Sequence, residues 1–313
     1  MVVSLEEGSG TTATKPTGRW SLIVTILIGL VWIVGQVFRD ATWLTGLCFY
    51  VPSPLVTLVF LAATIFEIRR RHRRAVWLTA CLTLPPLVVA VFVENRPFAT
   101  RPAPVAADFR VVHWNVASRL RWSGAMDVMR ALHADVYVLS EAGHPDGVVT
   151  YCEILGDDYQ TAQFAGLAVV ARGSLRLGET LLERRRTMVK LVDWHHAGRT
   201  LKLMVVDLPS ELNVARDPVL REINALIEQH QPDLVIGDFN APRRSWGLSQ
   251  LPDGYRHAFD TVGRGCGYTW PSFAPMLAID QCVTGPRIAP VNYELRTTLA
   301  SDHRLQVFDG AWR

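Results

Sequence analysis

The sequence predicts an α/β domain that follows three transmembrane helices. Three uncharged apolar runs fill the first hundred residues, and short Val- and Leu-rich runs separated by turns fill most of the rest. Among the short runs lie segments whose apolar residues recur at helical spacing. With 49% hydrophobic and 19% charged residues, the 313-residue chain cannot be a disordered protein or a collagen-like repeat.

The apolar runs at 20–38, 41–66 and 75–93 are each long enough to cross a bilayer. A hydrocarbon core about 30 Å thick needs roughly 20 apolar residues in a helix. Buried core helices or a cleaved signal are the alternatives, but a signal has a shorter apolar stretch than the first run. Prolines in the second and third runs are tolerated in membrane helices. We therefore expect a cytoplasmic tail at 1–19 and a three-helix membrane region at 20–93.

An arginine cluster at 69–74 separates the second and third runs. Cytoplasmic loops are rich in Lys and Arg, so this loop is predicted to be cytoplasmic and the chain after residue 93 extracytoplasmic. A nucleic-acid patch is the weaker interpretation because apolar runs flank the cluster closely. The net charge of +3 belongs to this part of the chain, since residues 101–313 hold 23 basic and 24 acidic residues.

Residues 94–107 are rich in Pro and Ala and are predicted to form a linker to a domain at 108–313. Helices are expected at 125–133 and from Asp217, where a proline follows in the first turn. Five cysteines with no CxxC spacing indicate neither a zinc site nor a disulfide framework. Strands are expected at 109–114, 135–140, 166–171, 188–192, 201–206, 234–236, 267–270, 278–283, 292–295 and 304–308.

Polar residues interrupt or end several of these apolar runs. In open α/β sheets such strand ends are where sites form, although Asn and Asp also cap helices and shape turns. The residues in question are Asn115, Glu141, Asp238, Asn240, Asp280, Asp302 and His303.

The ordered series N, E, GDFN, ID and SDH resembles the endonuclease/exonuclease/phosphatase superfamily, the metal-dependent phosphodiesterases that include DNase I. The segment Gly267-Tyr268-Thr269-Trp270-Pro271 ahead of Asp280 also resembles the family. The resemblance covers roughly residues 108–309 and implies a four-layer α/β sandwich, the DNase I-like fold, with two central sheets.

The resemblance implies a metal site made of Glu141, the main ligand, with Asn115 offering a neutral oxygen and Asp302 joining the shell. Oxygen donors without a Cys or His cluster favour Mg²⁺ most, with Mn²⁺ or Ca²⁺ as alternatives, over zinc. A divalent cation is therefore the expected cofactor.

The family pattern also implies catalytic roles. Asp238 would orient and deprotonate the attacking water, and Asn240 would hold the phosphate or that water. His303, as an imidazolium, would stabilise the developing charge, with Asp280 fixing its tautomer and raising its pKa.

Candidate substrate contacts are Arg243 and Arg244, which directly follow GDFN, and Trp270. Asp207 stands where many members carry a histidine, so it either contacts the substrate, binds a second cation or caps the next turn. His195, His196 and the arginines at 184–186 are interpreted as solvated surface.

The sequence thus predicts a membrane-anchored, divalent-metal-dependent phosphodiesterase or phosphatase. A domain with a charge near zero lacks the basic surface that tight DNA binding needs, so a phospholipid, lipid-linked or small phosphoester ranks level with nucleic acid. The alternative is a catalytically impaired phospho-ligand-binding or scaffold domain of the same fold. No obligate protein partner is evident.

Overall fold

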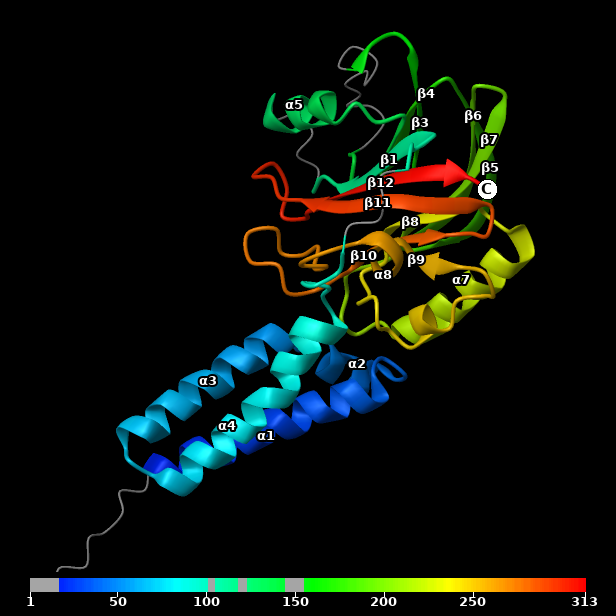
Figure 1. Ribbon diagram of the computed structural model, residues 1–313. Coiled ribbons are helices and arrows are strands. Elements are labelled where there is room, and N and C mark those ends of the chain that lie inside the picture. Colours follow the sequence, from blue (N-terminus) through cyan, green and yellow to red (C-terminus); the bar gives the residue numbers. More distant parts are fainter. Residues whose placement is uncertain (1–16, 101–104, 118–122, 144–154) are drawn as a thin grey trace, which may run out of the picture.

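The computed structural model describes the chain except residues 1–16, 101–104, 118–122 and 144–154. Figure 1 shows two parts, a bundle of long helices and a domain of two sheets that lies on one end of that bundle.

The bundle contains α1 (Thr17–Phe38), α2 (Trp43–Phe49), α3 (Ser53–Arg69) and α4 (Arg73–Val88), which continues into a π-helical turn at Val89–Val93. Within the described residues, two helices are long and apolar enough to cross a membrane. They become three if α2 and α3, which meet at 58°, form one broken span.

The bend between α2 and α3 explains why the second apolar run is not one straight helix. Pro52 lies just before α3 with φ −66° and ψ 130°, and Pro54 is in the first turn of α3. The residue before a proline avoids the helical region, so the chain leaves α2 and starts again.

The first turn of α1 and the arginine-rich turn between α3 and α4 lie at the same end of the bundle, away from the domain (Figure 1). The other end, with α2 and the end of α4, faces the domain. Leucine, isoleucine and valine side chains cover much of the outer surface of the bundle.

The domain consists of two six-stranded mixed sheets. The first has the order β11-β12-β1-β2-β4-β3 and the second the order β5-β6-β7-β8-β10-β9. In chain order the strands are β1 (Phe109–Asn115), β2 (Val136–Ser140), β3 (Tyr159–Phe164), β4 (Leu167–Arg172), β5 (Ser174–Arg184), β6 (Thr187–His196), β7 (Arg199–Asp207), β8 (Leu234–Asp238), β9 (Arg256–His257), β10 (Asp280–Thr284), β11 (Ile288–Arg296) and β12 (Leu305–Trp312).

Helices cover the outer faces of the two sheets, which gives the four layers that the family resemblance implies. Successive residues of a strand point to opposite faces. In β1, Val111 therefore packs between the sheets, and Val112 packs with Met129 of α5 (Ser123–Leu132). On the second sheet, Leu220 and Ile223 of α7 (Arg216–His230) pack against the outer face.

Most predicted strands and both predicted helices are present. Residues 267–270 are not a strand and make only a bridge between Trp270 and Leu277. Among the described residues, the elements that were not predicted are β3, β5, β9, the short helix α8 (Ala258–Val262) and a 3-10 turn at Gly247–Ser249. In β5 arginines and glutamates are interspersed with the leucines on a largely exposed edge strand, so its apolar signal is weak.

The start of the predicted linker is held against the domain. The backbone of Arg96 pairs with Gly265, and its guanidinium donates to the carbonyls of Phe259 and Asp260. The Asn95 side chain accepts a hydrogen bond from the backbone of Gly267. Composition indicates a linker here, but these contacts hold residues 95 and 96 against the domain directly after the π-helical turn that follows α4.

Candidate functional site

Strand register places three aspartates side by side at one end of the second sheet. Asp238 of β8 lies opposite Asp207 of the parallel β7 and opposite Asp280 of the antiparallel β10. Residues that are paired across neighbouring strands point to the same face. The sheet therefore presents a row of three carboxyl groups at the edge where β7 and β8 end.

The first sheet brings an amide and a fourth carboxylate to this place. Asn115 ends β1, and Glu141 follows β2 with a φ of 52°. The Asn115 amide nitrogen donates to Glu141 at 3.1 Å and to Asp238 at 2.9 Å, and its oxygen accepts from the Ala117 backbone. Asn115 thus joins carboxylates that the two sheets supply, with its nitrogen rather than its oxygen facing them.

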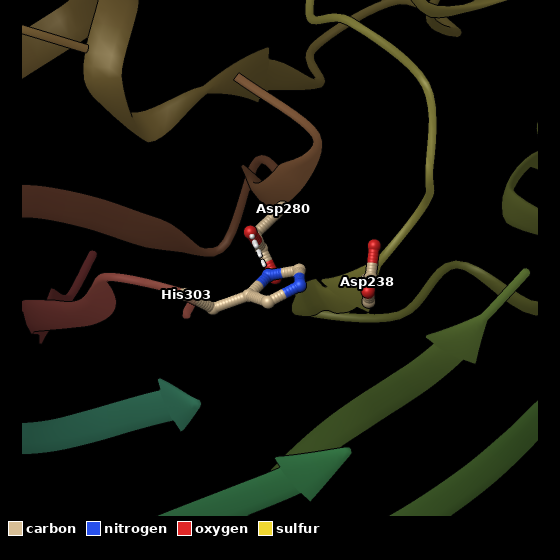
Figure 2. Close-up of side chains that lie close together, drawn as sticks. All are labelled: Asp238, Asp280 and His303. Atoms are coloured by element: carbon tan, nitrogen blue, oxygen red, sulfur yellow. Dashed lines mark hydrogen bonds and ion pairs between the residues drawn. The ribbon is translucent and has the colours of Figure 1, made fainter. Parts of the chain in front are cut away.

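His303 and Asp280 form a buried pair beside Asp238 (Figure 2). The distance from His303 Nδ1 to the Asp280 carboxylate oxygens is 3.0 and 3.3 Å. Burial opposes the imidazolium, but the charge and hydrogen bond of Asp280 outweigh it and raise the pKa of His303 to about 10. The pKa of Asp280 is lowered, since His303 outweighs the effect of burial. His303 is therefore a cation whose Nε2–H is free of this pair.

The remaining aspartates are poorly compensated. Burial and the charge of Asp280 raise the pKa of Asp238 to about 7. Burial, with the charges of Asp238, Glu141 and Asp280, raises the pKa of Asp207 to about 8. One imidazolium thus faces four carboxyl groups.

The GDFN segment has a backbone conformation that explains two of its residues. Gly237 has φ 155°, and a Cβ there would lie 1.8 Å from the Val206 carbonyl oxygen, so only glycine fits. Asn240 has φ 45°, in the left-handed region that asparagine tolerates. Its backbone donates to Asp238 Oδ1 at 2.9 Å, and its amide donates to the Leu208 carbonyl at 2.8 Å.

A cavity of about 420 Å³ opens beside this cluster. Its wall includes Glu141, Asp207 and Asn240, together with Arg185 and Arg186 from the β5–β6 turn. Sequence reasoning assigned these arginines to solvated surface. Only the pairing of β5 with β6 brings their turn to the site.

Arg243 and Arg244, the predicted substrate contacts, are not among the residues that line this cavity. Arg243 is buried, with its guanidinium 4.3 Å from the centre of the Phe259 ring and 3.0 Å from Asp260. Arg244 donates to Gln36 of α1 at 2.8 Å. Both belong to the junction between the domain and the helical bundle.

Trp270 and Asp302 lie together near His303. The indole nitrogen of Trp270 donates to Asp302 Oδ2 at 3.2 Å. Asp302 Oδ1 is buried without a hydrogen-bond partner among the described residues. Asp302 thus has one oxygen that can accept a further ligand, and Trp270 orients it.

His113 is a member of the site that sequence reasoning missed. It is fully buried in β1, with Nε2 3.0 Å from Ser140 Oγ and Nδ1 2.8 Å from the Gln306 amide. Burial lowers its pKa to about 4, so it is neutral and supports the strand ends. In the sequence, His113 is only a polar residue inside the apolar run VVHWN, and nothing in that pattern indicates that it belongs to a site.

Among the described residues, Asp238, Asp280 and His303 offer three ligand atoms within 4.8 Å of one another. Such a group could hold a metal ion. However, the raised pKa of His303 means that its ring holds both protons, and a metal ligand must give one up. The exposed Glu141 and the Asp302 oxygen without a partner fit a hard cation better.

A family model described as the Endonuclease/Exonuclease/phosphatase family matches residues 112–303, which include every polar residue of this cluster. The chain belongs to this family. Members of the endonuclease/exonuclease/phosphatase family are generally phosphoester hydrolases that use divalent cations. A comparison with curated protein sequences found no match.

Solved structures agree with this family fold at low sequence identity. A humanized D. rerio TDP2 with 14 mutations has a TM-score of 0.53 at 19% identity, covering 64% of this chain and 98% of that one. The D. rerio TDP2 complex with a single-strand DNA product has a TM-score of 0.51 at 18% identity, covering 64% and 98%. The human Nocturnin catalytic domain with bound sulfate has a TM-score of 0.50 at 16% identity, covering 69% and 100%.

The raised pKa of Asp207 predicts a pH-dependent stability effect. Below the unfolded-state pKa near 3.8 both states are protonated, and between that pH and about 8 the folded state loses stability because it resists ionisation. Asp207→Asn removes this cost. We expect its melting temperature in EDTA to exceed that of the wild type by at least about 4 °C near pH 9, and to equal it near pH 4. Equal melting temperatures at both pH values would contradict the raised pKa.

Proposed function

We propose that this protein is a membrane-anchored, divalent-metal-dependent phosphoester hydrolase. The observation that carries the proposal is the cluster of four carboxyl groups around one imidazolium beside an open cavity. Phosphoester hydrolysis needs a base for water, charge stabilisation on phosphate and a site for a cation, and the cluster offers a group for each.

The proposed ligands of the cation are Glu141 and Asp302 Oδ1, which has no hydrogen-bond partner among the described residues. Asn115 would keep Glu141 in place through its amide, and would add an oxygen only if that amide were reversed. The uncompensated negative charge supports a hard divalent cation, with Mg²⁺ favoured and Mn²⁺ or Ca²⁺ as alternatives. When bound, such an ion would neutralise charge on the phosphate.

Asp238 is the proposed general base. A pKa of about 7 is close to the ideal for a group that takes a proton at neutral pH. Its Oδ1 accepts from Asn240 and its Oδ2 from Asn115, so the carboxylate is held in one orientation. Asn240 also lines the cavity, where its side-chain oxygen can contact the attacking water.

His303 and Asp207 are the proposed donors to phosphate oxygens. Asp280 occupies His303 Nδ1, which leaves the Nε2–H for a non-bridging oxygen. Asp207 lines the cavity, and with a pKa of about 8 it carries a proton at neutral pH. A protonated Asp207 can donate a hydrogen bond as the family histidine would, which supports activity despite this departure.

The substrate class is a phosphoester, with phospholipid, lipid-linked, small-molecule and nucleic-acid esters as candidates. D. rerio TDP2 holds a single-strand DNA product and human Nocturnin a sulfate anion, and both support an anionic ligand for the present site.

Replacing the general base should abolish turnover. We expect the full-length wild type in detergent micelles to hydrolyse a phosphoester from a panel of lipids, nucleic acids and sugar phosphates with Mg²⁺ or Mn²⁺. Asp238→Asn should lower kcat about 100- to 10,000-fold. EDTA should remove the activity and added Mg²⁺ should restore it.

An Asp233→Asn variant is a matched control, because Asp233 is also a buried aspartate but accepts from the Lys202 backbone away from the cavity. Asp233→Asn should keep the activity. A wild type that is inactive across the panel would refute the enzyme proposal and favour a phospho-ligand-binding domain.

The arginines of the β5–β6 turn should contribute to substrate binding. Arg185→Ala and Arg186→Ala remove cations from the cavity wall, so each should raise KM about 5- to 20-fold with kcat little changed. Arg184→Ala is the control because Arg184 does not line the cavity, although, like Arg186 with Glu211 at 3.2 Å, it forms an exposed ion pair, with Glu222 at 2.8 Å. An equal rise in KM for all three variants would contradict a specific role of the cavity wall and indicate that only the total positive charge matters.

The proposed topology has three spans, with the catalytic domain outside the cytoplasm. The arginine-rich turn at the distal end of the bundle supports a cytoplasmic location for that end. After Arg313, a fused reporter that works only outside the cytoplasm should be active and one that works only in the cytoplasm should be inactive. The same two reporters inserted in the α3–α4 turn should give the opposite result. The reverse pattern would overturn the orientation.

A further inference from the structure

We propose that Tyr50, in the helical bundle, is a positioning residue for the catalytic loop. This inference rests on the proposed function, because it assigns Tyr50 a role through Asp238 and Asn240. It makes the membrane region part of the frame of the active site.

Tyr50 lies at the end of α2, before the bend that leads into α3. Its hydroxyl donates to the main-chain carbonyl of Asn240 at 2.7 Å, across 190 residues of sequence. The buried Arg216, at the start of α7, donates from Nε to the same carbonyl at a longer 3.3 Å. Tyr50 therefore makes the shorter contact to this part of the loop.

The carbonyl of Asn240 matters because both hydrogen-bond donors of this residue are already engaged. Its backbone N–H holds Asp238 Oδ1, and its side chain holds the Leu208 carbonyl. The N–H belongs to the peptide before the Cα of Asn240 and the carbonyl to the peptide after it, and the two peptides meet at this residue, whose φ of 45° leaves few alternative conformations. A bond that holds the carbonyl therefore limits how far the peptide that bonds Asp238 Oδ1 can shift.

Arg216 extends this support to the loop after β7. Its Nη1 and Nη2 donate to the carbonyls of Val214 and Glu211 at 3.3 and 3.0 Å. That loop begins at Leu208, whose backbone accepts from Asn240 and donates to Asp238. Tyr50, Arg216 and Asn240 therefore connect the bundle to both sides of the site.

Two other hydrogen bonds of the junction involve neither Asp238 nor Asn240. Asp40 accepts from the Trp246 backbone at 2.6 Å, and Gln36 accepts from Arg244 at 2.8 Å. They hold the two parts together and provide controls. Gln36→Ala breaks a junction bond of similar length without touching Asn240.

The test compares full-length wild type, Tyr50→Phe and Gln36→Ala in detergent micelles. Tyr50→Phe keeps the ring and removes only the donor. Because small misplacements of a catalytic group are costly, we expect kcat to fall about 10-fold or more, with KM within about 2-fold and an unchanged melting temperature. Gln36→Ala should keep both constants.

Hydrogen exchange measured by mass spectrometry gives a readout that does not need activity. In Tyr50→Phe, amides of residues 239–243 should exchange about 5-fold faster or more, with no change in α7 or in residues 246–251. Unchanged exchange and unchanged kcat would overturn the positioning role. Faster exchange in a protein whose wild type is inactive would support positioning and refute only the proposed function.

Discussion

The concentration of negative charge at the sheet edge is the constraint on which the rest of the site depends. Glu141, Asp207, Asp238 and Asp280 converge there, and the imidazolium of His303 is paired with Asp280. Isolated buried carboxylates would be protonated and inert. Two carboxyl groups with pKa values near neutrality are the consequence, and an added cation would relieve the same charge. Folding stability alone would not favour such a cluster, because burying these carboxyl groups destabilises the folded state at neutral pH.

The positions of these groups follow from strand register, and sequence reasoning could reach part of that. Asn115, Glu141, Asp238 and His303 end or precede apolar runs, so their convergence was predictable from the α/β pattern and the family resemblance. That Asp207, Asp238 and Asp280 form one row could not be predicted, because it depends on which strands pair. The direction of the Asn115 amide was likewise hidden, since it is decided by the Ala117 backbone donor.

Distance along the sequence from the GDFN motif was a poor guide to which arginines line the cavity. Arg243 and Arg244 follow GDFN directly, but after Pro242 the chain leaves the site, and Phe259 and Gln36 take up their guanidinium groups. Arg185 and Arg186 are far from any motif, yet an edge hairpin carries them to the cavity. The apolar pattern predicted the buried strands because they are buried on both faces, and missed β3 and β5 because edge strands are half solvated.

The junction between bundle and domain bears on which substrates the site can reach. Arg96 is paired with Gly265 only three residues after the π-helical turn ends at Val93, and Tyr50 and Asp40 add further hydrogen bonds between the bundle and the domain. A domain fixed at several points cannot swing as a tethered one would. With the bundle in a bilayer, the cavity would therefore keep a constant height and direction relative to the membrane surface. Substrates presented at that surface would meet the cavity in one geometry, whereas tight binding of a long nucleic acid needs an excess of basic residues that this domain, with a net charge near zero, does not have.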